Sequence, residues 1–169
     1  LLFNPNVGPI NNVLRAIGIA NPPKWLLSTK SALWGVMIVA IWKGGGYYMV
    51  MILAGLQGIP KQLYEAAEVD GAGPVRKFFS ITLPLLSPTT FMVTILSIIS
   101  SFQVFDLIQI MTEGGPGRAT NVLVYRIYQE GFQYMHYGYA SAMAYFLFAV
   151  ILVVTLIQFR GQKKWVTYM

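Results

Sequence analysis

The 169-residue sequence contains no cysteine and a single histidine, His136. Disulfides and thiolate metal sites are therefore excluded, and one imidazole cannot by itself form a metal cluster. Charged residues are also scarce: they make up 11% of the chain, against roughly 25% in ordinary soluble domains. Because 56% of the residues are hydrophobic, this composition argues against a soluble fold and predicts an integral membrane protein.

Acidic residues are fewer than basic ones, six against twelve, which gives a formal net charge of +6. A positive charge of this size can point to nucleic acid, but the basic residues are spread thinly between long apolar segments and form no single stripe. We therefore expect no nucleic-acid partner.

Sequence signatures of catalysis are missing as well. The chain has no G-x-x-x-x-G-K motif for cradling phosphates, so it is not expected to hydrolyse ATP. Serines are plentiful, but the one candidate base, His136, lies among aromatic residues at the edge of an apolar segment, where a boundary role is the simpler interpretation. The sequence thus predicts a protein that is not an enzyme.

Three segments are long and apolar enough to cross a bilayer, at residues 33–57, 86–111 and 139–159. A helix needs about 20 mostly apolar residues to cross a hydrocarbon layer of roughly 30 Å, and it satisfies its own backbone groups there. Pro60 and Pro84 are expected to mark helix ends, and Gly114-Gly115-Pro116-Gly117 interrupts the chain after the second segment. The predicted fold is all-α, a polytopic membrane protein with three transmembrane helices.

The basic residues predict the sides of the membrane. Residues 58–85 with the tail 160–169 form one side, and residues 1–32 with 112–138 form the other. The first set is richer in basic residues: Lys61, Arg76, Lys77, Arg160, Lys163 and Lys164, against Arg15, Lys24, Lys30, Arg118 and Arg126. The positive-inside rule therefore places the first set in the cytoplasm, the N-terminus of the chain outside and the C-terminus inside. Aromatic residues, including Trp165 and Tyr168, flank the third segment.

One short helix is expected in the outer segment 112–138. Thr120 is a candidate N-cap, and Val122, Leu123 and Ile127 supply an apolar side up to Glu130. An amphipathic helix lying on the bundle and a plain surface helix both fit this pattern.

The connector between the first two spans carries the most specific pattern. Pro60 suits a first helical position, Gly71 can take the positive φ that ends a helix, and Pro74 can begin a second short helix. Two short helices joined at an angle by Gly71-Ala72-Gly73 would form a compact protrusion, built from small residues that let another protein approach closely. We interpret this connector as a docking element.

The anchor residues of this connector are Glu65-Ala66-Ala67, then Gly71 after three residues, then Ile81-Thr82-Leu83-Pro84 after nine more. Their order and spacing resemble the EAA loop of ABC importer permeases. The segments Leu53-Ala54-Gly55-Leu56-Gln57-Gly58-Ile59-Pro60, Asp70-Gly71-Ala72 and Thr112-Glu113-Gly114-Gly115-Pro116 resemble the carbohydrate-uptake branch, which contains the maltose and glycerol-3-phosphate permeases. The resemblance covers nearly the whole chain.

The resemblance implies a function and a set of partners. The chain would be the C-terminal three-helix part of a permease in the bacterial cytoplasmic membrane. Its partners would be ATPase subunits that hold ATP and magnesium, a second, homologous permease subunit, an extracytoplasmic solute-binding protein and a sugar-like solute. The coupling residues carried over are Glu65, Ala66, Ala67, Asp70, Gly71, Ala72, Leu83 and Pro84, with Glu65 as the acidic contact to the ATPase subunit. An arginine partner would strengthen that contact.

Candidate solute contacts begin in the first span. Ala40, Lys43, Gly44, Tyr47 and Met51 follow helical spacing and form one stripe of small and polar character. Lys43 is roughly 15 Å along the helix from its outer end. This places it near the middle of the bilayer, where a lone ammonium costs at least about 2.5 kcal/mol. We expect Lys43 to face a cavity or a partner charge, with snorkelling to an interface as the alternative.

The second predicted span contains Asp106, the only acid inside a predicted span, together with Ser97, Ser100, Ser101 and Gln103. A straight helix would place the serines nearly opposite Gln103 and Asp106, so the two groups could not line one channel. By resemblance, the sugar-facing positions are Gly44, Tyr47, Ser97, Ser101 and Val104. We hypothesise that Tyr47 stacks on or hydrogen-bonds a sugar, and that Lys43 and Asp106 either pair or bind solute hydroxyls.

Two other functions fit the sequence less closely. An ABC importer for an amino acid or peptide would share the EAA loop and differ in its solute cavity. A membrane assembly protein with no transport path would share only the spans.

Overall fold

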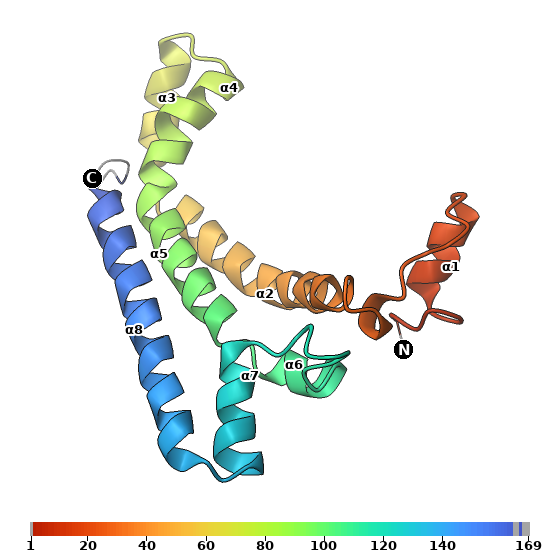
Figure 1. Ribbon diagram of the computed structural model, residues 1–169. Helices are drawn as coiled ribbons and strands as arrows, with labels where there is room; N and C mark the ends of the chain where they lie inside the picture. The colour runs from red at the N-terminus through yellow and green to blue at the C-terminus, as the bar shows by residue number, and fades with distance from the viewer. Residues whose placement is uncertain (1, 164–165, 167–169) are drawn as a thin grey trace. The chain divides into compact units, whose positions relative to one another are not determined.

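The computed structural model describes residues 2–163 and Val166, and the described residues form helices and loops without strands (Figure 1). The tail residues Lys164, Trp165 and Tyr168 lie outside the described residues. The helices are α1 Pro9–Ala16, η1 Trp25–Leu27, α2 Ala32–Gln57, α3 Lys61–Val69, α4 Pro74–Lys77, η2 Phe78–Thr82, α5 Leu83–Phe102, α6 Asp106–Met111, α7 Leu123–Tyr128, η3 Gln129–Gln133 and α8 Tyr137–Gln162. The predicted all-α membrane fold is confirmed.

Among the described residues, three continuous helical stretches are long and apolar enough to cross a membrane: Ala32–Gln57, Pro74–Phe102 and Tyr137–Gln162. The first begins one residue before the predicted segment, and the third extends the predicted segment by two residues at its start and three at its end. The second differs more. It begins at Pro74, so the short helix expected there is the start of the spanning stretch, and Pro84 lies inside a helix instead of ending one.

The second apolar segment was predicted to stay helical to Met111, which is wrong. The helix ends at Phe102, and the chain is non-helical at Val104 before α6 begins at Asp106. The straight-helix argument that set the serines opposite Asp106 therefore does not apply. Asp106 is the first residue of a separate short helix, where a carboxylate interacts favourably with the helix dipole.

The chain divides into two compact units, one of Leu1–Lys43 and Phe102–Phe148, the other of Gly44–Ser101 and Ala149–Met169. The first unit has a core of Val36, Ile108 and Tyr125, with Val104, Phe105 and Tyr128 among the residues packed against it. Aromatic rings strengthen this core, because Phe105 meets Tyr128 edge to face with ring centroids 4.9 Å apart.

The loop before α7 corrects another expectation. Thr120 does not cap the helix, since Val122 occupies that position. Thr120 is fully buried, its hydroxyl donates to the carbonyl of Gly115 at 2.8 Å, and it lies 2.7 Å from the hydroxyl of Thr112. A threonine in this setting stabilises the turn that follows α6, and Tyr125, 2% exposed, anchors α7 in the core.

A second polar arrangement organises the N-terminal part of the same unit. Asn11 is 1% exposed; its amide donates to the carbonyls of Pro5 at 3.0 Å and Pro23 at 3.2 Å, and its oxygen accepts from the indole N–H of Trp25. One buried side chain thus ties α1, the preceding loop and η1 together, and satisfies each of its buried polar groups in doing so.

In the second unit, α2 and α5 approach closely at Gly55. A Cβ atom at this position would lie 2.8 Å from the Cβ of Thr89. Phe91 and Phe159 form an edge-to-face pair with centroids 5.4 Å apart, which joins α5 to α8.

We predict that Gly55→Leu weakens packing in the second unit. The added side chain has to displace Thr89, and overpacking of this kind costs about 1–3 kcal/mol. The free energy of unfolding of the protein, measured by denaturant titration in detergent, should fall accordingly.

Gly46 provides the control for this substitution. It lies in the same helix with nothing within 4 Å of a Cβ atom. Gly46→Ala should leave stability unchanged or raise it by up to about 1 kcal/mol through helix propensity. Equal losses for both variants would contradict the close approach at Gly55.

Candidate functional site

The connector between α2 and α5 folds as two helices at an angle, joined by a tight turn (Figure 1). Pro60 immediately precedes α3 and is not its first helical residue, so the expected position is wrong by one. Pro74 is the first residue of α4, as predicted, and its missing N–H costs nothing at that position.

Gly71 ends α3 with φ +73°, the left-handed conformation that the sequence predicted. The turn forms two nested hydrogen bonds. The N–H of Ala72 donates to the carbonyl of Ala67 at 2.8 Å, and the N–H of Gly71 donates to the carbonyl of Glu68 at 3.0 Å. This is a Schellman arrangement, which satisfies the last carbonyls of a helix. The spacing from Ala67 to Gly71 is therefore the spacing that this helix end requires.

Two side-chain contacts brace the connector. The hydroxyls of Tyr64 and Thr82 lie 2.8 Å apart, which joins α3 to the end of η2. The ammonium of Lys77 lies 3.0 Å from the carboxylate of Glu68 and is mostly shielded from solvent. These contacts hold α3 against the base of α5, so the connector presents a defined shape.

Glu65 and Asp70 are exposed, and within the described part of the chain neither carboxylate has a hydrogen-bond or ion-pair partner. Large apolar side chains on the same connector are exposed too: Leu63, Val69, Val75, Phe78 and Phe79. Exposed apolar groups with polar side chains at their edge, on a braced support, are typical of a protein-binding surface.

Two prolines, Pro84 and Pro88, lie inside the membrane-spanning stretch Pro74–Phe102. Pro88, inside α5, cannot donate to the carbonyl of Pro84, and the hydroxyl of Ser87 donates to that carbonyl at 2.6 Å instead. Just before it, the N–H of Leu83 donates to the carbonyl of Phe78, five residues back. Serine hydroxyls and local π-type turns are the usual means of satisfying backbone groups that proline leaves unpaired.

A second candidate site lies in the first unit, where Lys43 of α2 forms an ion pair with Asp106 of α6. The two side chains are 60% and 55% exposed, so the pair lies at an open surface of the chain. Pairing was one of the two alternatives for these residues. The break in the helix at residues 103–105 makes this pairing possible, because Asp106 then belongs to the separate helix α6 and does not continue α5.

Comparisons with known proteins match almost the whole chain. The model of the family described as "Binding-protein-dependent transport system inner membrane component" matches residues 2–165. The chain belongs to this family. It is therefore a membrane component of a transport system, which agrees with the three helices of its described part that are long and apolar enough to cross a membrane.

Curated relatives of this inner membrane component include two permeases. It is 40% identical over 168 residues to the sn-glycerol-3-phosphate transport system permease protein UgpA of Brucella abortus, covering 99% of this chain and 57% of that protein. It is 41% identical over 163 residues to the sulfoquinovosyl glycerol transport system permease protein SmoG of Agrobacterium fabrum, covering 94% and 51%. The chain spans little more than half the length of these relatives.

A solved structure has the same fold. A chain in the crystal structure of a bacterial ABC transporter that imports the acidic polysaccharide alginate superimposes with a TM-score of 0.83 and 28% sequence identity. The match covers 96% of the present chain and 57% of the chain from the alginate transporter.

The remaining candidate solute-path residues of this inner membrane component are divided between the two units. In the second unit, Tyr47 is 62% exposed and meets Tyr48 edge to face, while the hydroxyls of Ser97 and Ser101 donate to carbonyls of their own helix. Gly44 lies next to Tyr48. In the first unit, Val104 packs against the core. The contacts of the described residues bring together only Lys43 and Asp106 from this set.

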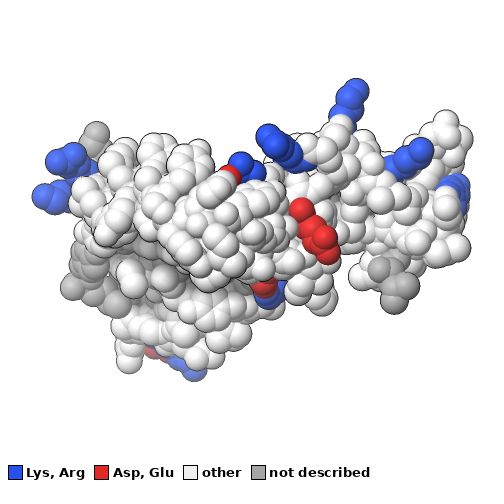
Figure 2. Space-filling view, turned by 60° about the horizontal axis from the view of Figure 1, so that its bottom comes forward, with Lys and Arg blue, Asp and Glu red and all other residues white. Residues whose placement is uncertain are grey.

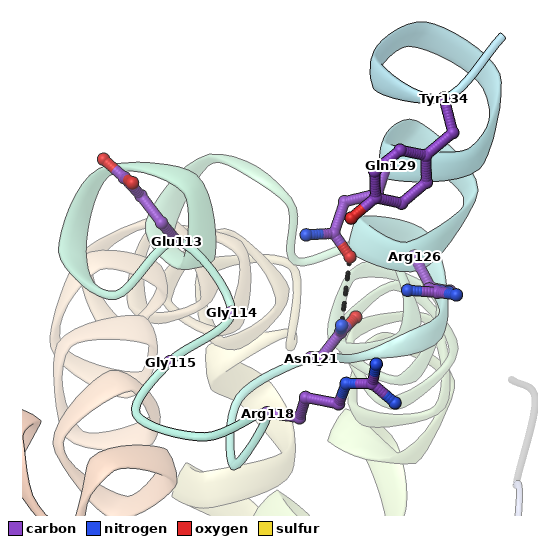
Figure 3. A pocket seen from close by; sticks show the side chains of 8 residues that line it. All are labelled: Glu113, Gly114, Gly115, Arg118, Asn121, Arg126, Gln129 and Tyr134. Carbon is purple, nitrogen blue, oxygen red and sulfur yellow. Dashed lines mark hydrogen bonds between the residues drawn. The ribbon is translucent and has the colours of Figure 1, made fainter.

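A polar cavity of about 170 Å³ lies in the first unit beside the loop after α6 (Figure 3). It is lined by Glu113, Gly114, Gly115, Arg118, Asn121, Arg126, Gln129 and Tyr134. The amide of Asn121 donates to that of Gln129 at 3.0 Å, and Figure 3 shows Glu113 turned away from this bond. Burial raises the pKa of Tyr125 nearby, with a smaller contribution from the charge of Glu113.

Glu130, 4% exposed, was not recognised from the sequence as a structural residue. It forms an ion pair with Arg126 and its other oxygen lies 2.8 Å from the Nδ1 atom of His136. The i, i+4 spacing of Arg126 and Glu130 could have indicated the first contact. The second depends on the turn at Met135, whose φ is +58°. His136 thus links the turn to η3. The described residues hold no group of three metal-ligating side chains.

We predict that Gly71→Val destabilises the connector. A β-branched residue at φ +73° is strained, at a cost of about 1–3 kcal/mol. Hydrogen exchange of the α3 amides in the full-length permease should become faster.

Gly73→Ala is the matched control, because Gly73 has φ −69° and open space around it. Its exchange pattern should equal that of the wild type. Unchanged α3 exchange in Gly71→Val would show that the turn does not need the left-handed conformation.

Proposed function

We propose that this inner membrane component is part of the permease of an ATP-driven, binding-protein-dependent importer for a sugar or sugar-like solute. The observation that carries the proposal is the braced connector 60–84, which exposes Glu65 on a helix ended by Gly71. Family membership supports the transport role. The substances named for its relatives, sn-glycerol-3-phosphate, sulfoquinovosyl glycerol and alginate, support a sugar-like solute over an amino acid or peptide.

The connector would bind the cytoplasmic ATPase subunit. In this proposal Glu65 accepts a charge-assisted hydrogen bond from a basic residue of that subunit, and the exposed apolar side chains around it exclude water from the contact. Tyr64 and Thr82, joined at 2.8 Å, would carry movement of α3 into the membrane-spanning stretch Pro74–Phe102. ATP and magnesium would be held by the ATPase subunit.

The remaining partners follow from the same proposal. A second, homologous permease subunit would complete the path, and an extracytoplasmic solute-binding protein would deliver the solute. The crystal structure of a bacterial alginate ABC transporter in complex with a periplasmic protein that holds an alginate pentasaccharide supports the latter partner. The side with residues 58–85 would be cytoplasmic, which places the N-terminus of this chain outside and its C-terminus inside.

The proposal predicts a specific role for Glu65. In the assembled transporter, Glu65→Gln should weaken binding of the ATPase subunit about 10-fold or more, since a hydrogen bond to a charged group is worth about 1.5–3 kcal/mol. Titration of the ATPase subunit onto permease in nanodiscs would measure this affinity.

Glu68→Gln is the control, one helical turn further along α3. Its carboxylate pairs with Lys77 inside the connector, so its loss should cost less than about 1 kcal/mol and leave affinity for the ATPase subunit nearly unchanged. Equal affinities for wild type and Glu65→Gln would refute the assigned contact.

The Lys43–Asp106 pair is the proposed solute contact. Each single variant, Lys43→Met and Asp106→Asn, leaves one charge without its partner. We expect both to lower solute uptake by the full-length transporter at least about 10-fold, since an unpaired charge within the membrane is costly.

The double variant separates two roles of the pair. If the pair only neutralises charge, Lys43→Met with Asp106→Asn should recover uptake. If either group also binds solute hydroxyls, uptake stays low and the apparent affinity for solute falls. Unchanged uptake and affinity in both single variants would rule out any role in transport.

A further inference from the structure

The helix α1 has an apolar side that the rest of the described chain leaves partly uncovered, with Ile10 and Leu14 half-buried and Val13 exposed. Its apolar residues Ile10, Val13 and Leu14, with Ile17 just beyond, follow i, i+3, i+4 and i+7, the spacing of one helix face. Val13 is 62% exposed and Ile17 69%. Leu2, Val7 and Leu27 of the adjoining loops are exposed to a similar extent, from 60% to 71%.

The opposite side of α1 is fastened to its own loops. Asn11 is buried in the three contacts with Pro5, Pro23 and Trp25. The guanidinium of Arg15 donates to the carbonyls of Pro5 at 2.9 Å and Asn6 at 3.1 Å. These bonds fix which side of the helix faces outward, so the exposure of Val13 and Ile17 follows from the way this segment is built.

All charged side chains in residues 2–31 are basic. Arg15, Lys24 and Lys30 lie in residues 2–31, and no acidic residue precedes Glu65 in the sequence. Within the described chain, the ammonium groups of Lys24 and Lys30 have no ion-pair partner. In Figure 2 the end of the chain that carries α1, at the right, shows basic side chains and no acidic ones.

The segment also adjoins a membrane-spanning helix. Only the residues from Ser28 to Ser31 separate η1 from α2. The first turns of α2 expose Trp34, Met37 and Ile38 by 41% to 62%. Exposed apolar side chains therefore continue from Leu27 into the part of α2 that enters the bilayer.

We propose that residues 2–31 lie in the headgroup region of the bilayer, with the apolar side of α1 turned toward the acyl chains and Lys24 and Lys30 beside phosphate groups of anionic phospholipids. Amphipathic helices with basic flanks bind membrane surfaces in this way. A second protein covering the same side would need carboxylates to match these cations, whereas an anionic leaflet supplies the matching charge at every position. The inference requires only that α2 spans the membrane and is independent of the solute.

The absence of cysteine from the chain makes a direct test possible. Val13→Cys, in the full-length permease cleared of other cysteines and assembled in its transporter, is labelled with an environment-sensitive fluorophore in nanodiscs. The nanodiscs contain phosphatidylglycerol and a phospholipid whose acyl chain carries a shallow quencher. We expect this lipid to quench the label at residue 13 at least threefold more strongly than a label at Asn12→Cys, on the polar side of the same helix.

Two results would overturn the proposal. One is equal quenching at residues 12 and 13, which would mean that α1 does not lie in the lipid. The other is a label at residue 13 that neither the lipid quencher nor aqueous iodide reaches, which would mean that protein covers this side. Both positions are exposed in the described chain, so the labels themselves should not disturb folding.

The contribution of charge is tested with Lys24→Gln and Lys30→Gln together. In the wild type, quenching at residue 13 should rise at least twofold when phosphatidylglycerol replaces neutral lipid at low ionic strength. The double variant should lose this dependence. A dependence that persists in the double variant would exclude these two lysines as the lipid contacts.

Discussion

Every backbone N–H and C=O group inside a bilayer has to find its partner within the protein, because the hydrocarbon layer offers no water. This constraint accounts for the three long helices and for the places where polar side chains occur. Even where Pro88 removes a donor from α5, the hydroxyl of Ser87 supplies another to the carbonyl of Pro84. Threonines of the same helix bond to carbonyls four residues back, as Thr90 does to Leu86. These polar side chains of α5 therefore satisfy backbone carbonyls of their own helix.

Because of the same constraint, the candidate functional residues lie at the ends and interruptions of the helices. The connector with Glu65 and Gly71 lies between two spans, and Asp106 becomes available only because the helix stops at Phe102. Outside the apolar layer, buried polar residues hold the loops together instead. Asn11 joins α1 to η1, Thr120 supports the turn before α7, and Glu130 joins Arg126 to His136. These residues shape the surfaces that a partner or the membrane would meet.

Local rules predicted the connector well because its signals depend on near neighbours. Gly71 at φ +73° and Pro74 at the start of α4 were both expected, since a helix end and a helix start are decided within a few residues. The failures have a common cause. Thr120 looked like a helix cap, and residues 86–111 looked like one helix, because hydropathy alone does not register a break at Val104 that the aromatic core around Phe105 stabilises.

Composition and spacing by themselves determined that this chain is helical, that three segments can span a membrane, and that in the connector 60–84 one short helix ends at Gly71 and another begins at Pro74. Those properties follow from apolar length and from backbone preferences that act over one or two turns. Only the tertiary structure decided that Lys43 pairs with Asp106, that Glu130 is buried against His136, and which side of α1 stays exposed. These contacts join residues that are distant in sequence or separated by an unforeseen turn, so no local pattern encodes them.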